Sequence, residues 1–218
     1  MIIMKPFIHL NSAMTADGKI AAKDSTLKIS GKEDLVRVHR LRKEYDAIMV
    51  GINTVLIDNP RLSIHKIDSE KEDNPTRIVI DSKARTPLNS RVLNDDAKTI
   101  IITSNKAKKE DVEKLSENAT VLCAGEDRVD LSDAMEQLYH LGINSILLEG
   151  GATLNFSMLE EQLVDKISIC IGSKILGGKE SITLVDGNGF DKDSCVKLEI
   201  EDYYKLDEDL VIEYKVIY

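Results

Sequence analysis

The chain lacks tryptophan altogether, and aromatic residues make up only 4% of its 218 residues. A platform of stacked aromatic rings for single-stranded nucleic acid is therefore not expected. The formal net charge of −9 also disfavours nucleic acid or an anionic membrane as the main partner, because both would be repelled by an acidic protein. An anionic ligand would have to be held by a local cluster of hydrogen-bond donors.

Cysteine is scarce as well: Cys123, Cys170 and Cys195 are far apart and form no Cys-x-x-Cys pair. Such usage is typical of free, buried thiols in a reducing cytoplasm. Long apolar runs are missing, since no stretch approaches the roughly 18 apolar residues of a membrane span. The N-terminal MIIMKPFIHL has no long apolar core of the kind found in signal peptides. We therefore expect a cytoplasmic protein that is not bound to a membrane.

Several well-known catalytic and binding motifs are also missing. The sequence contains no G-x-G-x-x-G after its first strands and no G-x-x-x-x-G-K-[ST], H-E-x-x-H or G-x-S-x-G. The H-x-E and P-C-x-x-C pair of the zinc deaminases is absent too. The histidines His9, His39, His65 and His140 are dispersed without ligand spacing, so we expect no metal site.

What the sequence does contain is an alternation of short apolar runs with helical patterns. Strands are predicted at residues 7–10, 47–50, 77–80, 99–103, 120–123 and 145–148, and helices at 33–45, 106–117, 131–141 and 153–163. Continuous Ile, Val and Leu runs favour a mostly parallel sheet with helices on both faces, which is an α/β fold. The length and the lack of a repeat predict a single domain over residues 1–218.

The last quarter of the chain has a different texture. Strands are predicted at residues 166–171, 196–200 and 210–217, with only loops between them. The partial alternation of the last strand predicts a C-terminal antiparallel hairpin at one edge of the sheet.

The helix predicted at residues 33–45 carries an arginine in an unusual place. Its apolar stripe consists of Leu35, Val38, Leu41 and Tyr45. Arg42 falls within that stripe, whereas Arg37 and Arg40 are expected on other faces. Two interpretations stay open. In the first, the aliphatic part of the Arg42 side chain lies along the core and its guanidinium group is in water or in a salt bridge. In the second, the guanidinium group binds a phosphate or carboxylate of the substrate.

A second group of polar residues follows the strand at 47–50. Thr54, Asp58, Arg61 and His65 are predicted to lie in one loop after that buried strand. Taken singly, Asp58 belongs to an ordinary Asp-Asn-Pro turn and His65 to a protein surface. Their density, at a position where α/β proteins tend to bind ligands, favours a site.

Two further strand ends carry donors for anions. The strand at 77–80 is followed by Ser82, Lys83 and Arg85. This segment is either an ordinary solvated strand end or a binding site for a monophosphate. Gly150 and Gly151 follow the strand at 145–148 and precede a helix, either as a plain turn or as bare amides for an anion. A second pair, Gly177-Gly178, is compatible with a hairpin loop.

Together these segments resemble a known family. The motifs NSAMTADGKIA, ISGKEDLVRVHRLRKEYDAIMVGINTVLIDNPRL, IVIDSK and ILLEGGATLNF, followed by KILGG, are similar to those of the riboflavin-biosynthesis reductases. That family comprises the reductase domain of the bacterial bifunctional deaminase–reductase and stand-alone archaeal and fungal enzymes. The resemblance covers nearly the whole chain, is greatest to the archaeal form, and implies a dihydrofolate-reductase-like fold, NADPH as hydride donor and a homodimer. No deaminase domain is expected within these residues.

The resemblance also implies roles for individual residues. The cofactor would be bound by Thr54, Asp58, Ser82, Lys83, Ala84, Arg85, Gly150, Gly151, Ala152, Thr153 and Leu154, with residues 82–85 near the 2′-phosphate and the stretch from 151 to 157 around the pyrophosphate. The substrate would be bound by Thr26, Arg42, Leu62, His65 and Glu149, with Arg61 sharing its phosphate. Bacterial members often have arginine where this chain has His65.

The implied reaction is hydride transfer to C1′ of a ring-opened ribosylamine, which leaves a ribityl chain. Glu149 is the candidate for relaying a proton or orienting the substrate, and a hydrogen bond to a pyrimidine amino group is the alternative. The archaeal resemblance favours the diamino pyrimidinone phosphate as substrate. Three alternatives remain: the deaminated uracil phosphate, dihydrofolate reduction, and NADPH binding without catalysis. NADH as a second coenzyme stays open as well.

Overall fold

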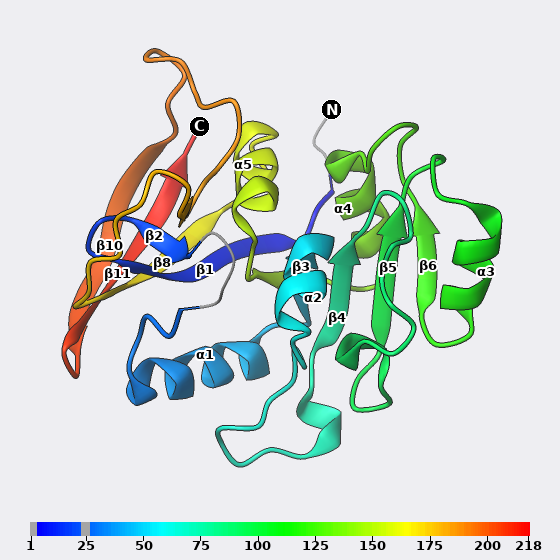
Figure 1. Cartoon of the computed structure of the whole chain (residues 1–218), viewed down its shortest axis with the longest axis horizontal. Coiled ribbons are helices and arrows are strands. Elements are labelled where there is room, and N and C mark those ends of the chain that lie inside the picture. The colour runs from blue at the N-terminus through cyan, green and yellow to red at the C-terminus, as the bar shows by residue number, and fades with distance from the viewer. Residues whose placement is uncertain (1–3, 23–26) are drawn as a thin grey trace. The chain divides into compact units, whose positions relative to one another are not determined.

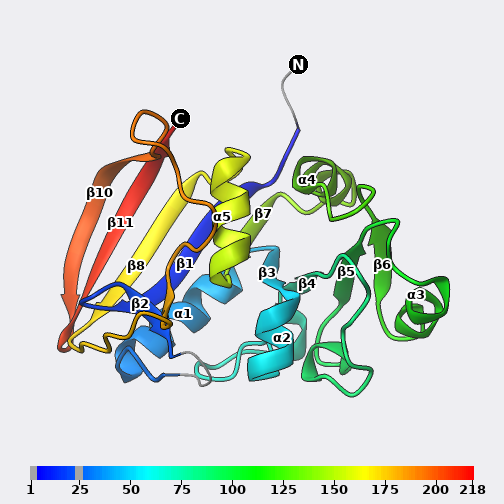
Figure 2. The same ribbon diagram turned by 45° about the horizontal axis from the view of Figure 1, so that its top comes forward.

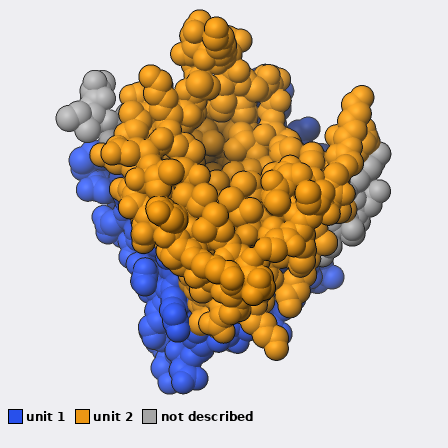
Figure 3. Space-filling view, turned by 90° about the vertical axis from the view of Figure 1, so that its left-hand side faces the viewer, with its two compact units in different colours: residues 1–7, 39–147 blue, residues 8–38, 148–218 orange. Residues whose placement is uncertain are grey.

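The computed structural model describes residues 4–22 and 27–218, and the chain divides into two compact units. Unit 1 comprises residues 1–7 and 39–147, and unit 2 comprises residues 8–38 and 148–218 (Figure 3). The first helix, α1 (Lys32–Glu44), contributes its first half to unit 2 and its second half to unit 1.

Unit 1 contains five strands that are hydrogen-bonded in the order β7-β3-β4-β5-β6. The strands are β3 (Ala47–Gly51), β4 (Thr76–Ile80), β5 (Thr99–Thr103), β6 (Thr120–Cys123) and β7 (Ser145–Leu148, whose last residue falls in unit 2). The helices are α2 (Ile52–Asp58), α3 (Lys109–Ser116) and α4 (Leu131–His140), with short 3₁₀ turns η1 (Lys71–Asp73) and η2 (Arg91–Leu93). The strands β3, β4, β5 and β6 pair in parallel.

The core of unit 1 explains the apolar strands. Val50 of β3, Val79 of β4 and Ile101 of β5 are fully buried and pack with Val55 of α2 and Leu115 of α3. Every residue of β5 is buried, as expected for a parallel strand covered on both faces.

One buried charge fixes the loop between η2 and β5. Arg77 of β4 is completely buried and donates to the carbonyl oxygens of Arg91 (3.0 Å), Asn94 (2.6 Å) and Ala97. It also donates to the Asn94 side chain at 2.8 Å. The flat guanidinium, with its several donors, satisfies carbonyl groups that the loop would otherwise leave unpaired.

Unit 2 contains four strands in the order β10-β11-β8-β1, which lie side by side in Figures 1 and 2. They are β1 (Phe7–Thr15), β8 (Lys166–Gly172), β10 (Lys197–Leu206) and β11 (Asp209–Ile217). The pair β1/β8 is parallel, whereas β8/β11 and β10/β11 are antiparallel. A second small sheet joins β2 (Lys19–Ala21) to β9 (Ile182–Thr183), and α5 (Ala152–Glu160) is the helix that follows β7.

The predicted fold is confirmed: the sheet is mostly parallel and ends in a C-terminal antiparallel hairpin with β10 at the edge. Predicted elements agree with the observed ones to within a few residues, except that β1 ends five residues and β10 six residues later than predicted. The structure adds α2, β2 and β9, which the sequence did not predict. Whether residues 1–218 act as a single domain stays a prediction.

The expected apolar stripe of α1 is wrong at its beginning. Leu35 is 37% exposed, whereas Asp34 is buried. Arg37, expected on another face, is bound at 2.7 Å by Asp34 and at 2.8 Å by Asn11 of β1. The charged pair can be buried because each partner satisfies the other, which apolar periodicity alone does not reveal.

The expectation of buried thiols is also partly wrong. All three cysteines are free, but only Cys170 is buried, and Cys123 and Cys195 are exposed. Burial raises the pKa of the Cys170 thiol to about 12, so this sulfur stays protonated.

The second glycine pair has a structural partner in the turn between β1 and β2. The Asp17 carboxylate accepts hydrogen bonds from the Thr15 hydroxyl (2.6 Å) and from the amides of Leu176 (3.1 Å) and Gly177 (2.7 Å). These hydrogen bonds, that of Thr15 first, lower the pKa of Asp17 to about 2. Gly177 therefore belongs to a segment that docks on Asp17.

We predict that Asp17→Asn lowers the melting temperature at neutral pH. The melting temperature of the variant should also depend less on pH in the acid range. A carboxylate whose folded-state pKa lies below its unfolded value stabilises the protein fully above the unfolded pKa, and that contribution is lost as pH falls through the folded pKa. The difference in melting temperature between wild type and variant should therefore shrink between about pH 4 and about pH 2. Thermal unfolding followed by circular dichroism across this range measures it.

Asp193→Asn, in an exposed loop of the same unit, serves as the control and should leave the curve unchanged. If the difference in melting temperature between wild type and Asp17→Asn stays constant down to about pH 2, the ionised carboxylate does not stabilise this turn.

Candidate functional site

In unit 1, the second half of α1 holds the loop that follows α2. Arg42 is half-buried and donates from Nη1 to the main-chain oxygen of Ser63 at 3.0 Å. Ser63 and Leu62 are buried, and Leu62 adopts a left-handed backbone with φ of 48°. Arg61 is exposed beside them. The predicted substrate residues Arg42, Arg61 and Leu62 are thus brought to one loop.

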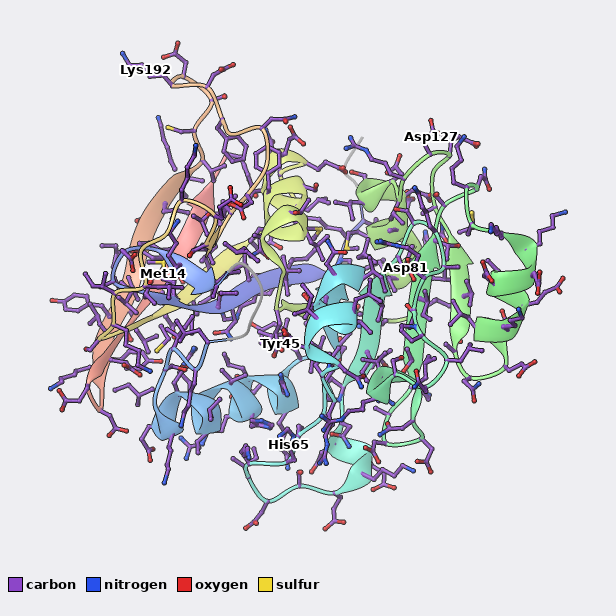
Figure 4. All side chains as sticks on the ribbon, viewed as in Figure 1. Met14, Tyr45, His65, Asp81, Asp127 and Lys192 are labelled. Atoms are coloured by element: carbon purple, nitrogen blue, oxygen red, sulfur yellow. The ribbon has the colours of Figure 1, made fainter. Side chains whose placement is uncertain are left out.

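At the end of the same loop, His65 (labelled in Figure 4) contacts His39 of α1. The His65 amide donates to Nδ1 of the buried His39 at 3.1 Å, and the two rings meet edge-on at 4.4 Å. Burial, followed by the charges of Arg42 and Lys66, lowers the pKa of both side chains, that of His39 to about 3. Both imidazoles are therefore neutral at pH 7.

Thr54 and Asp58 do not lie in that loop, and the prediction of one shared loop is wrong. Both are on α2, four residues apart and so on one face of the helix. Partial burial raises the pKa of the Asp58 carboxyl group. The sequence concealed α2 because the helix has seven residues and buries only Ile52 and Val55.

The segment after β4 forms a tight turn around a buried carboxylate. Asp81 is fully buried and accepts from the amide and the hydroxyl group of Thr86, both at 2.8 Å. Ala84 adopts a left-handed backbone with φ of 54°, and its amide donates to the Asp81 carbonyl at 3.0 Å. As a result Lys83 and Arg85 are exposed on this turn.

Ser82 joins this turn to two neighbouring loops. Its hydroxyl oxygen accepts from the Val129 amide at 3.0 Å, which leaves the hydroxyl proton to donate elsewhere. Its carbonyl accepts from the Ser104 hydroxyl group at 2.9 Å. The three loops at the carboxyl ends of β4, β5 and β6 are therefore one connected surface, near Asp81 and Asp127 in Figure 4.

Sequence analysis missed the contribution of the loop after β5. The Asn105 amide donates to the Gly125 carbonyl at 3.0 Å, and Lys106 lies 3.0 Å from the Asp127 carboxylate. The signal available was the polar triplet Ser104-Asn105-Lys106 directly after a strand with three successive isoleucines. Lys106 adds a third cation to the surface that carries Lys83 and Arg85.

In unit 2, Gly150 and Gly151 lead from β7 into α5. Gly150 has φ of +95°, a conformation that favours glycine, although a side chain there would meet Asn155 only at an ordinary 3.5 Å. Gly151 caps α5 without any side-chain hydrogen bond to the first turn. The amides of Ala152 and Thr153 therefore begin a helix whose N-terminus has no capping side chain.

Asn155 lies within the stretch from 151 to 157 that the resemblance implies around the pyrophosphate, although the sequence did not single out its side chain. It is 1% exposed, and its Nδ2 donates to the Leu184 carbonyl at 2.9 Å. In the described part of the chain, its Oδ1 is buried without a hydrogen-bond partner. An acceptor of this kind, one turn into α5, suits a hydroxyl or carboxamide donor of a bound ligand.

The residues present thus fit a phosphorylated dinucleotide such as NADPH. In unit 2, the uncapped N-terminus of α5 suits a pyrophosphate and the unpaired Asn155 oxygen suits a neutral donor. In unit 1, the cations Lys83, Arg85 and Lys106 suit an additional phosphate.

The remaining candidate residues that the structure describes follow β7 or lie at the start of α5. Glu149 is half-buried directly after β7, Ala152 and Leu154 are buried, and Thr153 is exposed. Thr26 lies outside the described residues. Across residues 4–22 and 27–218 there is no group of three or more metal-ligating side chains, and no helix in that part of the chain could span a membrane.

Comparison with known proteins gives consistent relatives over nearly the whole chain. The chain is 52% identical to the 2,5-diamino-6-ribosylamino-4(3H)-pyrimidinone 5′-phosphate reductase of Methanothermobacter thermautotrophicus, covering 98% of this chain and 99% of that protein. It is 41% identical to the reductase of the same name from Archaeoglobus fulgidus, covering 96% and 97%.

A solved structure supports the fold. RibD of Acinetobacter baumannii matches with a TM-score of 0.82 at 21% identity, covering 98% of this chain and 58% of that longer chain. This agreement confirms the predicted dihydrofolate-reductase-like fold. The family described as the RibD C-terminal domain matches residues 6–212, and together with the archaeal reductases this shows that the chain belongs to the RibD C-terminal domain family.

Proposed function

We propose that the protein reduces 2,5-diamino-6-ribosylamino-4(3H)-pyrimidinone 5′-phosphate to its ribitylamino form with NADPH, a step of riboflavin biosynthesis. The observation that carries the proposal is the 52% identity, over nearly the full length of both chains, to an archaeal reductase of that name. The anion-binding features described for each unit support it independently.

The reaction adds a hydride and a proton, in total two electrons and two protons, to a carbon–nitrogen double bond. When bound, NADPH supplies a hydride, which the open-chain imine accepts at C1′ while the electron pair of the double bond moves to nitrogen and takes up a proton. Arg42 and Arg61 would bind the substrate phosphate. Glu149 would orient the pyrimidine or pass the proton. Positioning of the reactants contributes most of the rate enhancement in such a site.

Each unit by itself carries residues that are proposed to bind the cofactor. Residues 150–154 and Asn155 would hold the pyrophosphate and a neighbouring polar group, and Thr54 and Asp58 would face the dinucleotide. Ser82, Lys83 and Arg85, joined by Lys106, would surround the 2′-phosphate that distinguishes NADPH from NADH.

The deciding experiment is to follow NADPH absorbance with enzymatically prepared diamino substrate and, in parallel, with its deaminated uracil analogue. We expect turnover of the diamino compound and at least about tenfold lower kcat/KM with the analogue, because one exchanged hydrogen-bonding group on a recognised edge costs about that much. Preferred turnover of the uracil compound would place the chain in the bacterial order of steps. NADPH binding without oxidation by either compound would refute the catalytic proposal.

Coenzyme selectivity tests the proposed phosphate clamp. Lys83→Ala and Arg85→Ala should each raise KM for NADPH about tenfold with little effect on NADH, because a charge-assisted hydrogen bond to the 2′-phosphate is lost. Lys98→Ala, an exposed lysine at the amino end of β5, is the control. Steady-state kinetics with both coenzymes give the ratio, and an unchanged ratio would place the 2′-phosphate elsewhere.

We also propose that two copies pair through the free edge of β10. Leu198 (42% exposed), Ile200 (58%) and Tyr203 (70%) lie on one face of this edge strand, because the register shift between Ile200 and Asp202 restores the alternation. A long exposed edge with apolar side chains is a template for strand pairing.

Replacing Ile200 with lysine should dissociate this dimer, because two buried charges would then meet at the interface. Light scattering coupled to size exclusion should give a dimer for the wild type and a monomer for Ile200→Lys. Ile175→Lys, at a 78% exposed apolar position outside β10, should remain dimeric. A wild-type monomer, or a dimer unaffected by Ile200→Lys, would contradict this surface.

A further inference from the structure

His39 is a buried histidine of α1 to which the proposed reaction assigns no role. It is 4% exposed, and its Nδ1 accepts the His65 amide at 3.1 Å. A ring nitrogen that accepts a hydrogen bond carries no proton, so neutral His39 has its proton on Nε2. Protonation of Nδ1 would break the link to His65.

The link continues into the ring of His65. Its Nδ1 lies 3.1 Å from the main-chain oxygen of Ser63, and a carbonyl oxygen can only accept. Nδ1 of His65 is therefore the donor, and Nε2 of the neutral ring is an acceptor. The edge-on contact with His39, at an interplanar angle of 85°, limits rotation of the His65 ring.

Hydrogen bonds fix the main chain at the three successive residues that end in His65. Ser63 also accepts from Arg42 at 3.0 Å, and the Ile64 amide donates to the Asn74 side chain at 2.7 Å. His39 provides the third hydrogen bond, at His65. Removal of the His39 acceptor would leave an amide unpaired at the position that aims the His65 ring.

The side-chain charges that shift the pKa of the two histidines are positive. Arg42 and Lys66 lower the pKa of both histidines in addition to burial, and Arg61 lowers that of His65 further, whereas the hydrogen bond to Ser63 raises it. His65 therefore brings no charge to an anion at neutral pH. Positive charge on this loop comes from Arg42, Arg61 and Lys66.

We propose that His39 is a positioning residue that holds the His65 main chain, so that His65 presents Nε2 as a hydrogen-bond acceptor for a hydroxyl group of the substrate's sugar phosphate. The phosphate itself is then bound by the arginines of the loop. This inference rests on the proposed reaction, because it assigns the group on the substrate that His65 recognises.

Two substitutions separate the hydrogen bond from packing. His39→Asn keeps an acceptor near the position of Nδ1, whereas His39→Phe keeps the ring shape without an acceptor. His140→Phe, at an exposed position of α4 in the same unit, is the matched control. Circular dichroism checks that each variant is folded.

The first readout needs no turnover. Nitrogen-15 spectra of the imidazole rings at neutral pH should show the Nε2–H tautomer for His39 and the Nδ1–H tautomer for His65. The His65 pattern should persist in His39→Asn and change to a mixture of tautomers in His39→Phe. A His65 ring that is unaffected in His39→Phe would overturn the positioning role, and so would the opposite tautomers in the wild type.

The second readout is kinetic. His39→Phe should raise KM for the pyrimidine phosphate about tenfold, the effect of one misplaced hydrogen bond, with kcat and KM for NADPH within about twofold. His39→Asn should restore most of the loss, and His140→Phe should match the wild type. Equal effects of His39→Asn and His39→Phe would overturn the proposal in favour of simple packing.

The ratio of KM between His65→Phe and wild type distinguishes an acceptor from a cation. Because both enzymes see the same substrate ionisation and the pKa of His65 is lowered from its ordinary value, this ratio should stay constant between about pH 7 and about pH 8. A ratio that grows towards acid would show a charged His65 on the phosphate and refute the acceptor role. If the wild type turns over no pyrimidine phosphate, the proposed reaction and the substrate role of His65 fail together, while the spectra still decide whether His39 positions it.

Discussion

The parallel pairing of β3, β4, β5 and β6 is the constraint on which the ligand-binding surface of unit 1 depends. Parallel strands bring all their carboxyl ends to one edge, so the residues after β4, β5 and β6 meet although they are far apart in sequence. Hydrogen bonds from Ser104 and Val129 to Ser82 then fix these ends to one another. Because of that strand order, the exposed cations after β4 and β5 lie on one surface.

The sequence predicted the strands well because a parallel strand covered on both faces is an uninterrupted apolar run. The prediction failed where the buried residues are polar or where the buried segment is short. Helix α2 buries two residues in a seven-residue span, so its period could not be distinguished from a loop. On α1, Asp34 and His39 are buried and Leu35 is exposed, because hydrogen bonds replace apolar contact there.

The candidate site divides in the same way. Residues with a distinctive motif, such as Gly150-Gly151 and Ser82 to Arg85, were predictable because backbone geometry and charge are local properties. Asn155 and His39 were not, since the importance of each comes from a single tertiary hydrogen bond or from the lack of one. No pattern of spacing in one sequence shows from which backbone amide a distant imidazole will accept a hydrogen bond.

An acidic protein can offer a site to an anion only where its positive charge is concentrated, and unit 1 has two such places. Lys83, Arg85 and Lys106 gather at the strand ends, and Arg42, Arg61 and Lys66 gather at the loop after α2. In the second group, a further charge on His39 or His65 would repel these cations and is suppressed. In the proposed site, the neutral histidines therefore provide hydrogen-bonding groups, whereas the arginines provide the positive charge.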